Sequence, residues 1–138
     1  MGKKGKKAWI AMNNLVLDTD IFIDLLRGFE KAKKYFEELG REDNIVHYSA
    51  VTEIELISGK ECNKIDKKAE IIKLLSQFSK IPVDNRIAIK AGDIRREYGV
   101  AFTDATIAAT AFVMKAKLIT RDVEDYNKIK EITVKVPY

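Results

Sequence analysis

One stretch near the start of the chain constrains its fold more than any other, because it joins an apolar strand to a helix through two acids. Leu15 to Leu17 form a short apolar run, which is typical of a strand buried on both faces. Asp18 and Asp20 follow, and apolar residues then recur at helical spacing as far as Gly28. Open α/β sheets bind ligands at the carboxyl ends of their strands. We therefore expect a site where this strand ends.

The alternation of strand and helix patterns continues to the end of the chain. We expect further strands at 45–48, 81–83, 118–120 and 132–136, and helices at 20–28, 30–40, 50–58, 64–79, 85–98 and 104–115. The expected N-caps are Ser49, Asp84 and Thr103, and the expected buried stripe of helix 64–79 is Ile65, Ala69, Ile72, Leu75 and Phe78. This order predicts an α/β fold with a parallel sheet between helices.

Composition narrows the class of protein. A chain of 138 residues is long enough for one domain with its own core. The single cysteine, Cys62, excludes an internal disulfide, so we expect a reducing, cytoplasmic location. No apolar run reaches the roughly 18 residues of a membrane span, and the first residues lack the apolar stretch of a signal peptide.

The net charge of +4 comes from the first residues of the chain. Without the four lysines between residues 3 and 7, basic and acidic residues are equal in number, at 21 each. We assign residues 1–14 to a basic extension that we expect to be disordered, and 15–138 to a single domain. A basic arm that contacts RNA is the alternative interpretation of this extension.

Acidic residues recur where the expected strands meet the expected helices. Asp18 follows the first strand, Glu53 lies on the first turn after the second, Asp104 begins an apolar helix and Asp122 follows the strand at 118–120. Carboxylates that converge at one sheet edge repel one another unless they take up protons or a cation. An all-oxygen site suits Mg²⁺ and can support phosphodiester hydrolysis. We expect Glu55, about 200° around the helix from Glu53, to face elsewhere.

Helix capping explains each of these acids when it is taken singly. The spacing alone therefore leaves a cation site and a set of helix caps as equal alternatives.

Four motifs in a fixed order resemble the PIN-domain family, and most of all its toxin branch, the VapC ribonucleases. They are LDTDIFIDLLRG at 17–28, SAVTEIEL at 49–56, TDATIAATA at 103–111 and LITRDVEDY at 118–126. The resemblance implies a three-layer α/β/α fold around a parallel sheet of four to five short strands. It also implies an endoribonuclease that uses Mg²⁺ or Mn²⁺, as one or two ions, and that acts as the toxin of a toxin–antitoxin pair.

The same resemblance assigns roles to residues and partners. It makes Asp18, Glu53, Asp104 and Asp122 both catalytic and metal-binding, with Asp20 and Thr120 as auxiliary residues. It implies a homodimer and a VapB-like antitoxin whose C-terminal segment docks near the site.

Arg121 adjoins the last of these acids, and we expect it to contact the RNA substrate because an acidic site needs a basic rim. The lysines at 64, 67 and 68 form a second basic run, for which a solvated helix face is the preferred interpretation over RNA contact.

Three other residues are expected to be structural. His47 is the only histidine and lies on a strand, so no histidine-paired nucleophile involving Cys62 is expected. Asp24 is expected to pair with Arg27, three residues along the same helix. Asp125 is expected to cap the turn at Tyr126.

Three alternative functions stay open at this stage. One is an RNA-processing PIN nuclease without an antitoxin, and another is a PIN domain that binds without catalysis. A phospho-receiver domain is also an α/β protein with an acidic Mg²⁺ pocket, but it needs a lysine after the strand at 118–120, where this chain has Arg121 and Asp122.

Overall fold

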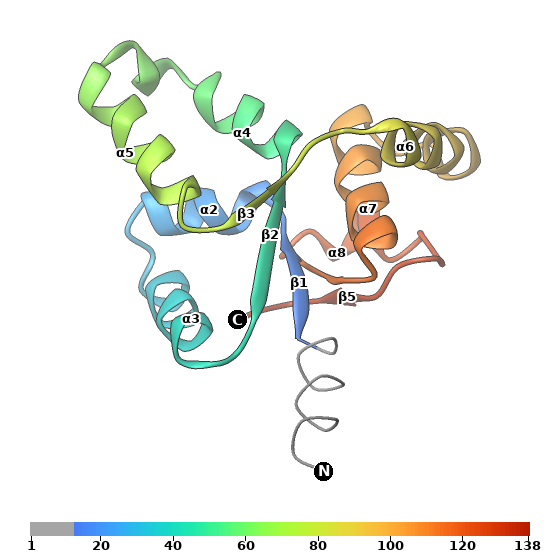
Figure 1. Cartoon of the computed structure of the whole chain (residues 1–138), viewed down its shortest axis with the longest axis horizontal. Coiled ribbons are helices and arrows are strands. Elements are labelled where there is room, and N and C mark those ends of the chain that lie inside the picture. The colour runs from blue at the N-terminus through green and yellow to red at the C-terminus, as the bar shows by residue number, and fades with distance from the viewer. Residues whose placement is uncertain (1–12) are drawn as a thin grey trace.

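A computed structural model describes residues 13–138 (Figure 1), and its core is one five-stranded sheet. The strand order is β3-β2-β1-β4-β5, and every neighbouring pair is parallel. The strands are β1 (Asn14–Leu17), β2 (Ile45–Ser49), β3 (Ser79–Ile81), β4 (Lys117–Ile119) and β5 (Val134–Lys135). No helix in this part of the chain is long and apolar enough to cross a membrane.

Helices cover both faces of the sheet, because successive strand residues point to opposite sides. Val16 of β1 and Leu118 of β4 pack into one core, and Leu15 and Leu17 pack into the other. The first core lies under α6 (Asn85–Tyr98), α7 (Phe102–Met114) and α8 (Val123–Tyr126). The second lies under α2 (Thr19–Leu26), α3 (Glu30–Arg41), α4 (Ala50–Ile57) and α5 (Ile65–Leu75), and a short 3₁₀ turn, η1 (Lys60–Asn63), joins α4 to α5.

This architecture confirms the expected α/β/α class with a parallel sheet. Two of the expected caps are present: Ser49 Oγ accepts a hydrogen bond from the amide of Val51 at 3.1 Å, and Asp84 accepts one from Ile87 at 3.0 Å. The first strand starts at Asn14, within the segment assigned to the extension, and the rest of that assignment falls on residues 1–12, outside the described residues.

Two local predictions are wrong. Helix α7 begins at Phe102, so Thr103 lies inside the helix and does not cap it. Helix α5 ends at Leu75, and its buried residues are Ile71 and Leu75, whereas Ile65 and Ile72 are exposed. Leu75 of the expected stripe is confirmed, and Phe78 packs against the core. Ile71 takes the place expected for Ile72, because helical spacing alone left several apolar rows to choose from.

Candidate metal centre

Asp18 lies at the carboxyl end of β1, where its carboxylate is almost fully buried. Its Oδ1 accepts a hydrogen bond of 2.8 Å from the amide of Thr19, so Asp18 also caps α2. Its Oδ2 accepts one of 2.8 Å from the hydroxyl of Thr120, which follows β4 and has no exposed surface. Asp18 and Thr120 thus meet at one sheet edge, as the pairing of β1 with β4 requires.

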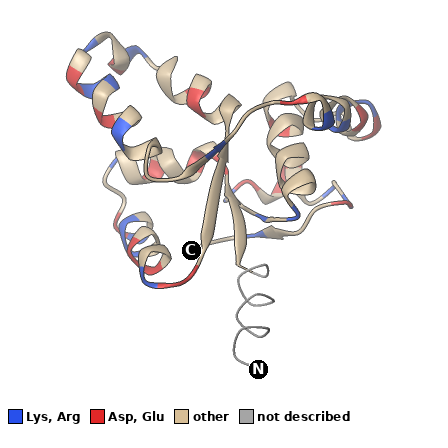
Figure 2. Ribbon diagram, in the orientation of Figure 1, with Lys and Arg blue, Asp and Glu red and all other residues tan. Residues whose placement is uncertain are grey.

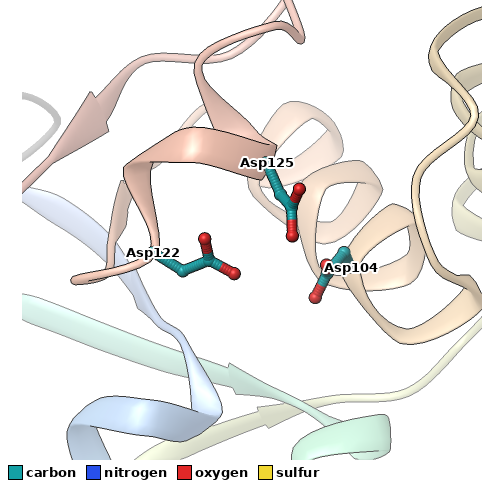
Figure 3. A group of neighbouring side chains, drawn as sticks. All are labelled: Asp104, Asp122 and Asp125. Atoms are coloured by element: carbon teal, nitrogen blue, oxygen red, sulfur yellow. The ribbon is translucent and has the colours of Figure 1, made fainter.

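A second group of acids, Asp104, Asp122 and Asp125, lies near the same edge of the sheet. Carboxylate oxygens of Asp104, Asp122 and Asp125 all lie within 4.8 Å of one another. Figure 3 shows the three side chains pointing toward a common point, from α7, from the loop after β4 and from α8. Asp125 therefore does not cap its turn as expected, because α8 begins at Val123 and carries Asp125 inside it.

Asp20 lies beside Asp18 on the first turn of α2. Its Oδ2 accepts a hydrogen bond of 3.0 Å from the amide of Arg121, and its Oδ1 is buried without a hydrogen-bond partner in the described chain. A buried carboxylate oxygen without a donor is costly, because it has lost water and gained no replacement. A cation or a bound water beside this oxygen would stabilise it.

Burial and mutual repulsion raise the pKa values of these carboxyl groups. Burial raises the pKa of Asp18 to about 7, and the negative charge of Asp20 adds to the rise, against the hydrogen bonds from Thr120 and Thr19. Burial also raises the pKa of Asp20 and that of Asp104, and the charges of Asp122, Asp125 and Glu55 raise the latter further. The site therefore favours a neutralising proton or cation.

The two glutamates of α4 lie on different sides of that helix. Glu55 accepts a hydrogen bond of 2.6 Å from Thr19 Oγ1, and its charge acts on Asp104. Glu53 instead forms a 2.9 Å ion pair with Lys80 of β3. The expectation that Glu53 joins the other acids while Glu55 faces away is thus not met. The helix presents to α2 the side that carries Thr52 and Glu55, which are three residues apart, and turns Glu53 toward β3.

Asp24 is structural, but its partner is not Arg27. The guanidinium of Arg121 donates two hydrogen bonds to its carboxylate, from Nε at 2.6 Å and from Nη2 at 2.8 Å. The hydroxyl of Tyr138 donates a third, at 2.5 Å. Because both partners lie about a hundred residues away in sequence, local spacing pointed to the wrong cation.

Basic and acidic residues are interspersed on helix α5 (Figure 2). Along α5, lysines alternate with acids, and Lys67 lies 3.9 Å from Glu70. His47 bonds through Nε2 to Asn14 Oδ1 at the amino end of β1, and Cys62 donates to the carbonyl of Leu56. These contacts agree with structural roles for His47 and Cys62.

The donor set fits a divalent cation. Within residues 13–138, Asp18, Asp104 and Asp122 form no ion pair with lysine or arginine, and Asp125 has only a 3.9 Å contact with Lys128. All candidate ligands are oxygens, which hard ions such as Mg²⁺ and Mn²⁺ prefer. The unpartnered Oδ1 of Asp20 adds a buried acceptor beside them.

Comparison with known proteins agrees with this geometry. The family model of the PIN domain matches residues 15–132. The chain is 30% identical over 123 residues to ribonuclease VapC10 of Mycobacterium tuberculosis, covering 86% of this chain and 90% of that protein. It is 29% identical over 139 residues to ribonuclease VapC1 of Methanocaldococcus jannaschii, covering 97% and 94%.

A solved structure is similar as well. A chain in a toxin–antitoxin complex from Klebsiella pneumoniae superposes with a TM-score of 0.75 at 31% identity, over 90% of this chain and 98% of that one. The sequence matches, the superposition and the order of the acids along the chain thus all indicate the same family. The protein belongs to the PIN-domain family, and its similarities group it with the VapC ribonucleases.

Proposed function

We propose that this protein is a divalent-metal-dependent endoribonuclease and the toxin of a toxin–antitoxin pair. The observation that carries the proposal is the close approach of Asp104 to Asp122 and Asp125, with the charge of Asp104 also acting on Asp18. Within residues 13–138, no lysine or arginine forms an ion pair with Asp18, Asp104 or Asp122. Repulsion of this kind is costly in a merely structural cluster. It is expected where the charges hold a cation.

The proposed metal-holding residues are Asp18, Asp104 and Asp122, with Asp125 beside them. Geometry favours Glu55 over Glu53 as the carboxylate that α4 contributes, because Glu53 is already paired with Lys80. These residues would hold Mg²⁺ or Mn²⁺, as one or two ions, which would supply an activated water and would stabilise negative charge on the scissile phosphate.

The other side chains orient this set. Thr120 fixes the plane of the Asp18 carboxylate through Oδ2, and its hydroxyl oxygen also accepts a hydrogen bond of 2.9 Å from the amide of Asp122. Asp20 is held through Oδ2 by the amide of Arg121, and its buried Oδ1 has no hydrogen-bond partner in the described chain. Water molecules and ligands at such a site are thereby held in fixed directions, which lowers the entropic cost of reaction.

Arg121 is the proposed contact to an RNA phosphate. Its guanidinium has five N–H donors, of which the Asp24 carboxylate takes two. The remaining donors lie on a side chain that is 46% exposed, next to the acids. An arginine fixed in this way loses less side-chain freedom when it binds a phosphate.

The decisive test is cleavage of single-stranded RNA by the purified protein. We expect cleavage with Mg²⁺ or Mn²⁺, none after chelation by EDTA, and none by Asp18→Asn, whose circular dichroism should match that of the wild type. Cleavage at the wild-type rate in EDTA, or by Asp18→Asn, would contradict the proposal.

The antitoxin is proposed to bind beside the site. A hollow of about 500 Å³ lies between α2, α4 and η1–α5, and Glu55 forms part of its wall together with apolar residues such as Ile23 and Leu26. A segment of a small antitoxin that fills this hollow would reach the acids and block RNA. The similar Klebsiella pneumoniae chain comes from a toxin–antitoxin complex, which supports this partner.

Growth separates a toxin from an RNA-processing nuclease. Expression of the chain should arrest growth, and co-expression of a small adjacent open reading frame should restore it. Normal growth on expression of an active enzyme would favour the processing role. Sedimentation of the free protein would test the proposed homodimer.

A further inference from the structure

A tyrosine side chain lies directly beneath the acids and contacts two of them. Tyr126 of α8 has no exposed surface and packs into the core under α6 and α7. Its hydroxyl lies 3.1 Å from Asp104 Oδ1 and 3.3 Å from Asp18 Oδ1. One phenolic proton is thus shared between carboxylates from α7 and from the end of β1.

The hydroxyl completes the set of protein donors around Asp18. An ionised carboxylate accepts about four hydrogen bonds. Asp18 accepts three from the protein: from Thr19 and Tyr126 at Oδ1, and from Thr120 at Oδ2. The carboxylate is therefore fixed in plane and position, and about one lone pair is left for another ligand.

On Asp104 the hydroxyl has a different effect. Tyr126 is the only side chain with a hydrogen bond to this carboxylate within residues 13–138, and it binds Oδ1 alone. The shared proton reduces the repulsion between Asp104 and Asp18 without introducing a cationic side chain. Phenylalanine in place of this tyrosine would leave the two carboxylates facing an apolar ring.

We propose that Tyr126 is a positioning residue for the divalent cation, whose hydroxyl holds Asp18 and Asp104 in the arrangement that binds the ion. This inference rests on the proposed function, because it requires a cation at these acids. Partners of ligand side chains commonly change metal affinity by about 10- to 100-fold when they are removed. A hydroxyl that only stabilised the core would leave that affinity unchanged.

The test compares two tyrosines that each donate to a carboxylate. Tyr126→Phe removes the hydroxyl beneath the site, and Tyr48→Phe removes one that lies 3.5 Å from Glu53, which is paired with Lys80. Both tyrosines are buried, so both variants delete one oxygen from a packed ring. Calorimetric titration of Mn²⁺ into each purified, chelator-treated protein measures the affinity without any activity assay.

We expect the dissociation constant for Mn²⁺ to rise about tenfold or more in Tyr126→Phe and to stay within about twofold in Tyr48→Phe. An unchanged or tighter constant in Tyr126→Phe would overturn the inference. A tighter one would mean that the hydroxyl substitutes for the cation and competes with it.

A second measurement tests the inference even if a variant is too unstable for calorimetric titration. The rise in melting temperature on adding Mn²⁺ is taken within each variant, so a general loss of stability cancels. We expect a smaller rise in Tyr126→Phe than in Tyr48→Phe, and equal rises would contradict the inference. If the wild type itself binds no Mn²⁺, the proposed function fails, which is a separate outcome.

Discussion

Carboxylates at the edge of this sheet fall into two regions that differ in what neutralises them. Glu53 faces Lys80, and Asp24 faces Arg121 through two hydrogen bonds, so each of these acids has its cation within the protein. Asp104 and Asp122 face each other and Asp125 instead. Position at the edge is therefore a weaker guide to function than the absence of a basic partner.

The largest expected effect is on RNA cleavage, and it comes from changing an acid that has no basic partner. Asp122 makes no side-chain hydrogen bond or ion pair in the described chain, so Asp122→Asn removes no contact and should not lower the melting temperature of the metal-free protein. We expect RNA cleavage to fall about a thousandfold, because a cation at such a site contributes several kcal/mol to the transition state. The control is Glu124→Gln, which replaces an exposed acid of α8 two residues further along the chain and should cleave normally. Full activity in Asp122→Asn would mean that the acids without basic partners matter no more for cleavage than the paired ones.

The two glutamates of α4 give the next comparison. Glu55→Gln should lower kcat/KM about 10- to 100-fold, because Glu55 acts on Asp104 and is held by Thr19. Glu53→Gln should change it by no more than about twofold, because it breaks only a half-exposed ion pair. A larger loss of kcat/KM in Glu53→Gln than in Glu55→Gln would mean that Glu53, and not Glu55, acts in the site.

The pH dependence of stability should also separate the regions. The pKa of Asp18 is about 7 in the folded protein, against 3.8 for a free aspartate, so the folded state keeps a proton that the unfolded chain releases. This contribution is complete below about pH 4 and is lost as the pH rises through about 7. In EDTA, we expect the free energy of unfolding to fall by roughly 1 kcal/mol per pH unit across that range.

Urea unfolding at several pH values measures this slope. Asp18→Asn should flatten it, since asparagine does not titrate. A slope in Asp18→Asn equal to that of the wild type would assign the effect to other groups.

The smallest expected effects concern the paired acids. Arg121→Gln leaves the buried Asp24 without its cation and should cost about 2 kcal/mol, below the usual range for buried pairs because Arg121 is half-exposed. Lys80→Gln should cost less than about 1 kcal/mol. Urea midpoints compare them, and equal losses would mean that the two pairs do not differ in kind.

Sequence patterns predicted the sheet and its helices because these depend on local alternation. They also predicted which acids lie near the carboxyl edge of the sheet, and the roles of those acids stay a prediction. Asp18 and Thr120 meet at the carboxyl edge because β1 pairs with β4. Asp104 and Asp122 lie close to each other there, and Asp20 accepts a hydrogen bond from the amide of Arg121. The pattern could not orient α4, since choosing between Glu53 and Glu55 requires knowing which neighbour each side of the helix faces.

Contacts between distant segments were equally hidden. Asp24 meets Arg121 and Tyr138 only because α2, the loop after β4 and the last residue come together in the fold. Tyr126 was noted for its turn and not for its hydroxyl, which the fold brings to two acids more than 20 residues away. A tyrosine at a position that packs into the core was the one hint in the sequence, because its buried hydroxyl needs a hydrogen-bond partner.

The acids without basic partners are proposed to hold a divalent cation, and the paired acids are not. Calorimetric titration of Mn²⁺ into the wild type, Asp122→Asn and Glu53→Gln tests this proposal directly, without RNA or an antitoxin. We expect the wild type and Glu53→Gln to bind Mn²⁺ with the same affinity, and Asp122→Asn to bind it at least about tenfold more weakly. Equal affinity in Asp122→Asn and the wild type would contradict it.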